Sequence, residues 1–232
     1  MRTIGLVGGM SWESTAEYYR IINETVKERL GGLHSAKIVI YSLDFAEIDV
    51  LQREERWTEA AGCMIEASKC VERAGADFIL LCTNTMHKVA DEVSRAVALP
   101  LLHIADATGE EVLARGIKKV GLLGTIYTME QEFYKDRLTA RYGLEVLTPN
   151  PSDRKRVHEL IYNELCLGEI RESSRTELRR IIEELVKEGA EGIVLGCTEL
   201  PLLVRSQDST VPLFDTTRIH AQKAVEMALR NF

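Results

Sequence analysis

The sequence has no long apolar run, few prolines and no excess of positive charge. No apolar run approaches the roughly 18 residues that a membrane-spanning helix needs. Lys and Arg number 29 against 36 Asp and Glu, which gives a formal net charge of −7 without a basic block for nucleic acid. With 45% apolar residues and only five prolines, the 232-residue chain can bury a large core. We therefore expect a globular protein whose partner is neither a membrane nor a nucleic acid.

Cysteine is also scarce. The chain has five cysteines, an odd number, and no CxxC pair, so neither a disulfide framework nor a zinc site is predicted. The five histidines show no metal-ligand spacing. We expect free thiols, no bound metal and a cytoplasmic location, because no secretion signal precedes the first strand-like run.

What the chain does contain is an internal repeat. Residues 189–199 read Gly-Ala-Glu-Gly-Ile-Val-Leu-Gly-Cys-Thr-Glu, and residues 75–85, 114 positions earlier, read Gly-Ala-Asp-Phe-Ile-Leu-Leu-Cys-Thr-Asn-Thr. Two further pairs of segments match, residues 3–9 with 119–125 at an offset of 116, and 99–103 with 211–215 at an offset of 112. Three matches in the same order predict two related α/β halves.

Short apolar runs alternate with helical periodicity in both halves. The predicted strands are 3–7, 37–43, 77–82, 100–103, 119–125, 144–147, 192–196 and 211–215. The predicted helices are 13–30, 58–73, 86–96, 105–115, 152–167, 173–188 and 216–229. This alternation predicts parallel sheets with right-handed crossovers, in a first domain of residues 1–104 plus 210–232 and a second domain of residues 105–209.

Polar turns follow several of the predicted strands. In parallel α/β sheets a ligand lies beyond the carboxyl ends of the strands, where helix N-termini offer unpaired N–H groups to an anion. Residues 8–11 and 83–85 form such turns in the first half, and residues 124–125 and 197–199 in the second. Two facing turns, each with a proton-transfer group, could remove a proton from one face of a small molecule and return one to the other.

Cys197 is the best candidate for such a group. A thiol has a reference pKa of about 8.5, which is readily lowered at a helix N-terminus. Cys197 directly follows a predicted strand and precedes Thr198-Glu199-Leu200-Pro201, so we expect its pKa to be lowered. The alternative is a buried cysteine with a packing role.

Three segments carry a resemblance to a known family. They are Gly-Leu-Val-Gly-Gly-Met at residues 5–10, Thr83-Asn84-Thr85-Met86-His87, and Gly196-Cys197-Thr198-Glu199. The sequence resembles the aspartate/glutamate racemase superfamily over essentially its whole length, most of all the enterobacterial broad-spectrum or L-aspartate/glutamate-specific type. The resemblance implies two pseudo-symmetric flavodoxin-like domains with the active site in the cleft between them, a homodimer, an amino-acid substrate, and no pyridoxal phosphate or other cofactor.

The chain departs from the family at one position. The family usually has Cys-Asn-Thr in the first half, whereas this chain has Thr83-Asn84-Thr85 and its cysteine one place earlier, at Cys82. The internal repeat also aligns Thr83 with Cys197. We predict that Thr83 and Cys197 are the two catalytic groups, with Thr83 the weaker acid; the alternative for Thr83 is a hydroxyl that only binds the substrate carboxylate. Neighbouring side chains of a strand point to opposite faces of the sheet, so Cys82 should point away from the site if Thr83 points into it. The alternative is that Cys82, and not Thr83, is the second acid or base.

Other residues are expected to bind the substrate. Asn84, Thr85 and Thr198 carry donors for its carboxylate or partners for its ammonium group. Residues 52–56 are mostly a solvated charge run, but they follow the second predicted strand, so Gln52 or Arg53 could reach the substrate side chain. Glu164 occupies a position where family members that use acidic substrates carry a lysine. A glutamate there would repel an acidic side chain, which leaves neutral polar amino acids such as homoserine open, unless Glu164 faces water. The full predicted binding set is Met10, Gln52, Asn84, Thr85, Thr125, Glu164 and Thr198.

Two rival functions stay open at this point. One is a one-thiol decarboxylase or isomerase of the same superfamily, which protonates an enolate from Cys197 alone. The other is a non-catalytic amino-acid sensor that uses the same turns. Nucleotide binding is not predicted, because neither a GxGxxG fingerprint nor a P-loop lysine is present.

Overall fold

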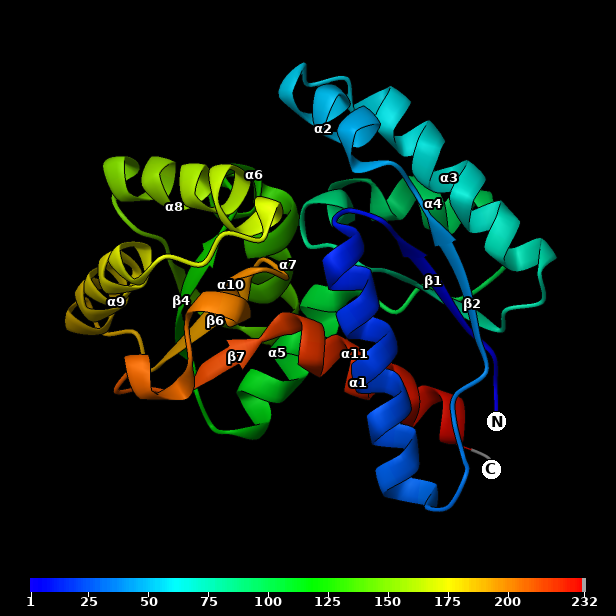
Figure 1. Cartoon of the computed structure of the whole chain (residues 1–232). Coiled ribbons are helices and arrows are strands. Elements are labelled where there is room, and N and C mark those ends of the chain that lie inside the picture. The colour runs from blue at the N-terminus through cyan, green and yellow to red at the C-terminus, as the bar shows by residue number, and fades with distance from the viewer. Residues whose placement is uncertain (231–232) are drawn as a thin grey trace. The chain divides into compact units, whose positions relative to one another are not determined.

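The structure, a computed structural model, describes residues 1–230 of the chain. It divides into two units, Met1–Ile104 with the segment that begins at His220, and Ala105–Ile219. Each unit contains one sheet, of three strands in the first and four in the second, and every pairing is parallel. The prediction of an α/β protein with two parallel sheets is confirmed (Figure 1).

In the first unit the strand order is β2-β1-β3. The strands are β1 (Ile4–Gly8), β2 (Ile38–Ser42) and β3 (Phe78–Leu81). The helices are α1 (Trp12–Leu30), α2 (Phe45–Arg53), α3 (Trp57–Arg73), the 3-10 helix η1 (Thr85–Val89) and α4 (Ala90–Ala96), together with α11 (Thr216–Leu229) from His220 onward. Alternate strand residues face opposite layers: Leu6 packs with α1 and α11, whereas Val7 packs with α2, α3 and α4.

In the second unit the strand order is β5-β4-β6-β7. The strands are β4 (Lys119–Gly124), β5 (Glu145–Leu147), β6 (Gly192–Gly196) and β7 (Leu213–Asp215). The helices are α5 (Ile104–Ala114), α6 (Ile126–Glu130), α7 (Glu132–Tyr142), α8 (Pro151–Asn163), the 3-10 helix η2 (Leu165–Leu167), α9 (Glu172–Lys187), α10 (Leu200–Leu203) and the 3-10 helix η3 (Ser206–Asp208). One face of this sheet packs its apolar side chains against α8 and α9.

The two units repeat the same local architecture. Strands β2-β1-β3 correspond to β5-β4-β6, and the backbone continues the match beyond them. The Ile79 amide donates to the carbonyl of Pro100 at 2.9 Å, and the Ile193 amide donates to the carbonyl of Pro212 at the same distance. The internal repeat of the sequence therefore corresponds to a repeat of hydrogen-bond register.

Several predicted elements differ from the observed ones. Residues 100–103 form only an isolated bridge, between Leu101 and Ile79, and not a strand. The helix predicted over 86–96 is split into η1 and α4. The helix predicted over 152–167 ends at Asn163, because Glu164 has φ −128° and ψ −67°, which lie outside the helical region.

The expected domain boundary also moves. Residues 210–219, which we assigned to the first domain, lie in the second unit because β7 pairs with β6. Residues 231–232, also assigned to the first domain, lie outside the described residues. Within residues 1–230, no helix is long and apolar enough to cross a membrane.

Candidate active site

Both sheets have a point at which the strand order reverses. From β1 the chain forms β2 on one side and later β3 on the other, and β4 has β5 and β6 on its two sides in the same way. In open α/β sheets ligands bind beyond the carboxyl ends of the strands at such a point. In the first unit β1 leads into Gly9, and β3 leads through Cys82 into Thr83; in the second unit β4 leads into Thr125 and β6 into Cys197.

The turn after β1 is held closely against its neighbours. The Gly9 amide donates to Thr15 Oγ1 at 2.8 Å, and Thr15 Oγ1 donates to the Ser11 carbonyl at 3.0 Å. Gly9 has φ +90°, and a Cβ added there would lie 2.1 Å from the carbonyl oxygen of Leu43. Only glycine fits this position, for steric as well as conformational reasons.

The turn after β3 contains Thr83, Asn84 and Thr85, which are all buried. His87, one helical turn further on, fixes the backbone of this turn. Its Nδ1 donates to the Thr83 carbonyl at 2.7 Å, and its Nε2 accepts from the Ile104 amide at 3.1 Å. A ring that donates through one nitrogen and accepts through the other is neutral, so His87 supports the position of Thr83 as an uncharged imidazole.

Two predicted binding residues of the first unit lie next to this turn, in different roles. Gln52, on α2, is 1% exposed and donates from Nε2 to Met86 Sδ at 3.1 Å, directly beyond Thr85. Met10 is 4% exposed and belongs to the apolar cluster that contains Met86. Met10 is therefore a core side chain in this structure.

Cys82 lies on the opposite side of the same strand end. Its amide continues the sheet ladder by donating to the Val7 carbonyl at 2.8 Å. Its side chain is fully buried in the cluster with Leu6, Tyr18 and Leu80, and burial raises the pKa of the thiol far above its ordinary value. The surroundings of Cys82 are those of a packing residue.

In the second unit, the turn after β6 contains a compact group of three polar side chains. Cys197 Sγ donates to Glu199 Oε2 at 2.9 Å, and Thr198 Oγ1 donates to the same oxygen at 2.8 Å. All three residues are buried, with Cys197 6% and Glu199 4% exposed. The turn thus joins a thiol, a hydroxyl and a carboxylate.

This geometry changes the expected acidity of Cys197. Burial raises the pKa of the thiol well above its ordinary value, and the negative charge of Glu199 raises it further. The expectation of a lowered pKa is therefore wrong. The helix that follows, α10 (Leu200–Leu203), has only four residues, too few aligned peptide dipoles to offset the carboxylate.

Thr125 caps the helix that follows β4. Its Oγ1 accepts from the Thr128 amide at 3.3 Å, and the two hydroxyls are 3.2 Å apart. Thr125 is 5% exposed. Its hydroxyl thus satisfies a backbone donor at the N-terminus of α6, at the strand end where we predicted a substrate contact.

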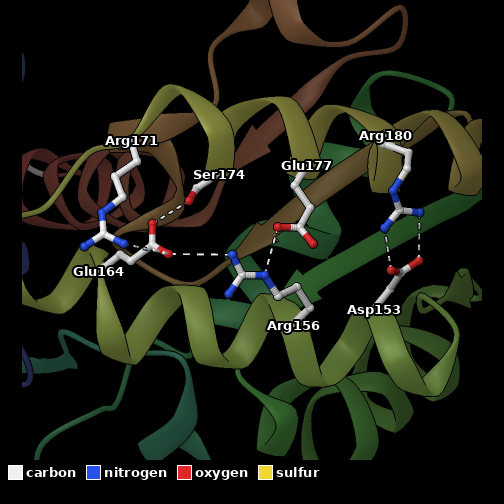
Figure 2. A network of polar contacts seen from close by, with 7 residues as sticks. All are labelled: Asp153, Arg156, Glu164, Arg171, Ser174, Glu177 and Arg180. Atoms are coloured by element: carbon white, nitrogen blue, oxygen red, sulfur yellow. Dashed lines mark hydrogen bonds and ion pairs between the residues drawn. The ribbon is translucent and has the colours of Figure 1, made fainter.

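Glu164 takes part in a polar network between α8 and α9, drawn in Figure 2. Ser174 Oγ donates to its carboxylate, and guanidinium groups of Arg156 and Arg171 lie 3.7 and 3.8 Å from it. Arg156 also bonds to Glu177 at 2.8 Å. The Glu164 side chain is only 8% exposed, so the alternative that it faces water does not hold. The two arginines, which pair more closely with Glu177 and Glu169, partly offset its charge.

Two residues near the site were not among the predicted site residues. The position of Glu199 was available in the sequence, because it stands two residues after Cys197 in the repeated turn. His87 had a weaker signal, a helical turn after Thr83, and its hydrogen bond to Ile104 could not be read from spacing. Within residues 1–230, no three His, Cys, Asp or Glu residues are grouped to hold a metal ion.

Comparison with known proteins gives consistent matches over the full length. The profile of the family described as Asp/Glu/Hydantoin racemase matches residues 7–224. A crystal structure of a candidate Asp/Glu racemase from Yersinia pestis is 56% identical, covers 99% of this chain and 100% of its own, and superposes with a TM-score of 0.92.

Two more distant proteins agree with these matches. An aspartate racemase homologue from Pyrococcus horikoshii is 39% identical, with 99% and 100% of the two chains covered and a TM-score of 0.85. The broad specificity amino-acid racemase of Bacillus subtilis is 25% identical over 97% of this chain and 98% of its own.

Proposed function

Since the chain belongs to the Asp/Glu/hydantoin racemase family of isomerases, we propose that it racemises amino acids by two-base transfer of the α-proton without pyridoxal phosphate. One observation carries this proposal. Thr83 and Cys197 occupy equivalent positions of the repeat, two residues after β3 and one residue after β6, and each of these strands adjoins the central strand, β1 or β4, about which the order of its sheet reverses. One reacting group from each copy of the repeat is what inversion at a carbon requires.

In the proposed reaction one group takes the α-proton and the other delivers a proton to the opposite face of the carbanion. Cys197 serves one face and Thr83 the other. A threonine hydroxyl is a much weaker acid than a thiol, so the Thr83 step is the slower of the two. The carboxylate and ammonium groups of the substrate are held by Asn84, Thr85 and Thr198. These residues directly follow Thr83 and Cys197 in the sequence and are buried like them.

Acidic amino acids are the proposed substrate class. A glutamate at position 164 would disfavour them, but its charge is partly offset by the Ser174 hydroxyl and by Arg156 and Arg171, which also pair with Glu177 and Glu169. A carboxylate compensated in this way repels an acidic side chain much less than an isolated one. Gln52, buried beside Met86, is the proposed contact to the substrate side chain. A homodimer in the cytoplasm is the proposed form of the enzyme.

Incorporation of solvent deuterium at the α-carbon tests this function. Each enantiomer of aspartate, glutamate and homoserine is incubated without cofactor with the wild type, Cys197→Ala, Thr83→Ala and Cys82→Ala. Loss of a general acid or base typically costs about 100-fold or more, so both site variants should lose racemisation. Thr83→Ala should still exchange the enantiomer whose α-proton faces Cys197, because that thiol can remove and return a proton by itself.

Cys82→Ala is the matched control because its side chain lies in the core. Exchange that is abolished by Cys82→Ala and untouched by Thr83→Ala would contradict the assignment of the two groups. Carbon dioxide released from a malonate-type acid, with no exchange of any amino acid, would instead identify a decarboxylase. Amino-acid binding without exchange would identify a sensor.

A further inference from the structure

We propose that Glu199 is the internal proton acceptor of Cys197, and that it holds the thiol proton on Oε2 while the thiolate removes the α-proton of the substrate. This inference rests on the racemase function proposed above. Glu199 acts through Cys197, so it positions and ionises the reacting group without touching the substrate's α-carbon.

The contacts of the carboxylate support this role. Glu199 Oε2 accepts two hydrogen bonds, from Cys197 Sγ at 2.9 Å and from Thr198 Oγ1 at 2.8 Å. An ionised carboxylate can only accept, so both groups must donate to it. The thiol proton therefore already points at the oxygen that is to receive it, and the transfer needs no change of side-chain position.

The burial of the pair makes an internal acceptor useful. Cys197 is 6% and Glu199 4% exposed, which limits the access of water that could take the proton. A thiolate beside an ionised carboxylate would place two like charges about 3 Å apart, which is strongly unfavourable at a buried site. Transfer of the proton to Glu199 leaves a single negative charge on the pair.

The first copy of the repeat provides an internal comparison. The residue that aligns with Glu199 is Thr85, and the one that aligns with Cys197 is Thr83. The first turn therefore has a hydroxyl and no carboxylate where the second has a thiol and a carboxylate. The carboxylate occurs in the copy whose reacting group is acidic enough to transfer a proton to it.

The proton balance is simple. The S–H bond of Cys197 breaks and an O–H bond forms on Glu199 Oε2, with the electron pair left on sulfur. The thiolate then forms a new S–H bond to the α-proton, and the C–H electron pair stays on the substrate as a carbanion. The Thr83 side delivers a proton to the opposite face. After product release, Glu199 loses its proton to solvent and the Thr83 side regains one.

This route makes the reaction insensitive to pH near neutrality, since the proton moves within the protein. In Glu199→Gln the thiol must lose its proton to solvent instead. We expect kcat/KM of racemisation in this variant to fall about 100-fold at pH 6. It should then recover by about tenfold per pH unit, as loss of one proton to solvent requires. The wild type should change little from pH 6 to pH 8.

A second measurement needs no substrate. The rate at which iodoacetamide alkylates Cys197 follows its thiolate fraction and is read by mass spectrometry of the peptide that contains it. In Glu199→Gln the thiolate forms only by loss of its proton to solvent, so the alkylation rate should be lower than that of the wild type at pH 6 and should rise by about tenfold per pH unit, whereas the wild-type rate should change little. A purely structural role of Glu199 would leave the pH dependence of alkylation unchanged.

Glu199→Asp is the conservative control. It keeps a carboxylate at this position, so it should retain the flat pH profile even if its rate is lower. Equal loss of racemisation at every pH in Glu199→Gln, with an unchanged alkylation rate, would overturn the proposal. Should Glu199→Gln fail to fold, a sloped pH profile in a folded Glu199→Asp would overturn it equally. If the wild type racemises no amino acid, the racemase function fails, whereas the alkylation rates still decide whether Glu199 controls the thiol proton.

Discussion

The stability of the first unit should depend on pH through His220, which is fully buried on α11. Its Nε2 donates to the Leu102 carbonyl at 2.9 Å, and its Nδ1 accepts from the hydroxyl of Tyr18 at 2.8 Å. The ring of His87, itself neutral, lies 5.9 Å away between centroids. No carboxylate among these contacts could stabilise an imidazolium, and burial lowers the pKa of His220 from 6.5 to about 4.

The sign of the effect follows from proton linkage. Between pH 6.5 and pH 4 the unfolded chain binds a proton at His220 that the folded unit does not, so stability falls as the pH falls. The full contribution is present above pH 6.5 and is lost by about pH 4. The shift from 6.5 to about 4 corresponds to about 3 kcal/mol in total, of which about 2 kcal/mol is lost by pH 5.

Urea unfolding followed by tryptophan fluorescence measures this effect in the correct unit. The chain has two tryptophans, Trp12 and Trp57, and both lie in the first unit. The comparison variant is His220→Gln, which keeps one donor and one acceptor but does not titrate. Between pH 7 and pH 5 the wild type should lose about 2 kcal/mol more than this variant.

The hydroxyl partner supplies the control. Tyr18→Phe removes the donor to Nδ1 and should cost about 1 to 2 kcal/mol, while the slope of stability with pH persists because His220 still titrates. Parallel loss of stability in the wild type and His220→Gln would refute the assignment. The proton responsible would then bind elsewhere in the unit.

Two further predictions concern local packing. Gly9→Ala places a Cβ 2.1 Å from a backbone oxygen at φ +90° and should lower the free energy of unfolding by at least about 2 kcal/mol. Gly31→Ala is also at positive φ but has no atom within 4 Å, so it should lower this free energy by only about 1 kcal/mol. Urea unfolding measures both. Ser174→Ala removes the hydroxyl donor to the buried Glu164 carboxylate and should cost about 2 kcal/mol. Glu177→Ala breaks a more exposed ion pair and should cost less than about 1 kcal/mol, measured for both variants by urea unfolding followed by circular dichroism. Equal costs for the two glycine variants, or for Ser174→Ala and Glu177→Ala, would contradict the corresponding prediction.

The repeat was the part of the fold that could be read from sequence. Offsets of 112 to 116 between three segments predicted two α/β halves, and the structure repeats even the hydrogen bond from Ile79 to Pro100 in that from Ile193 to Pro212. The first residues of two helices that have a capping side chain were also predicted to within one residue. Helix α1 starts at Trp12 because Ser11 caps it, and α8 starts at Pro151 because Asn150 caps it.

The remaining features depend on partners that are distant in sequence. Apolar periodicity runs through residues 152–167, but the helix ends before Glu164, whose carboxylate is held by Ser174 on α9 and by two arginines. Tyr18 and His220 are 202 residues apart, and no local pattern links them. The pKa of Cys197 was predicted to be lowered by the helix N-terminus that follows it. Burial and the Glu199 carboxylate raise this pKa instead, and neither effect could be recognised from the sequence.

The difference between the two turns cannot be recognised from the kcat/KM values of racemisation in the two directions. Enantiomers have equal free energies and share the transition states between them, so kcat/KM must be the same in both directions whatever groups transfer the proton. A slow Thr83 step therefore lowers kcat/KM equally in both directions. Exchange without inversion has no such constraint, because a single group can remove and return the α-proton of one enantiomer. Exchange by Thr83→Ala of the enantiomer that faces Cys197, and of that enantiomer alone, is hence the direct measure of how far the two copies have diverged.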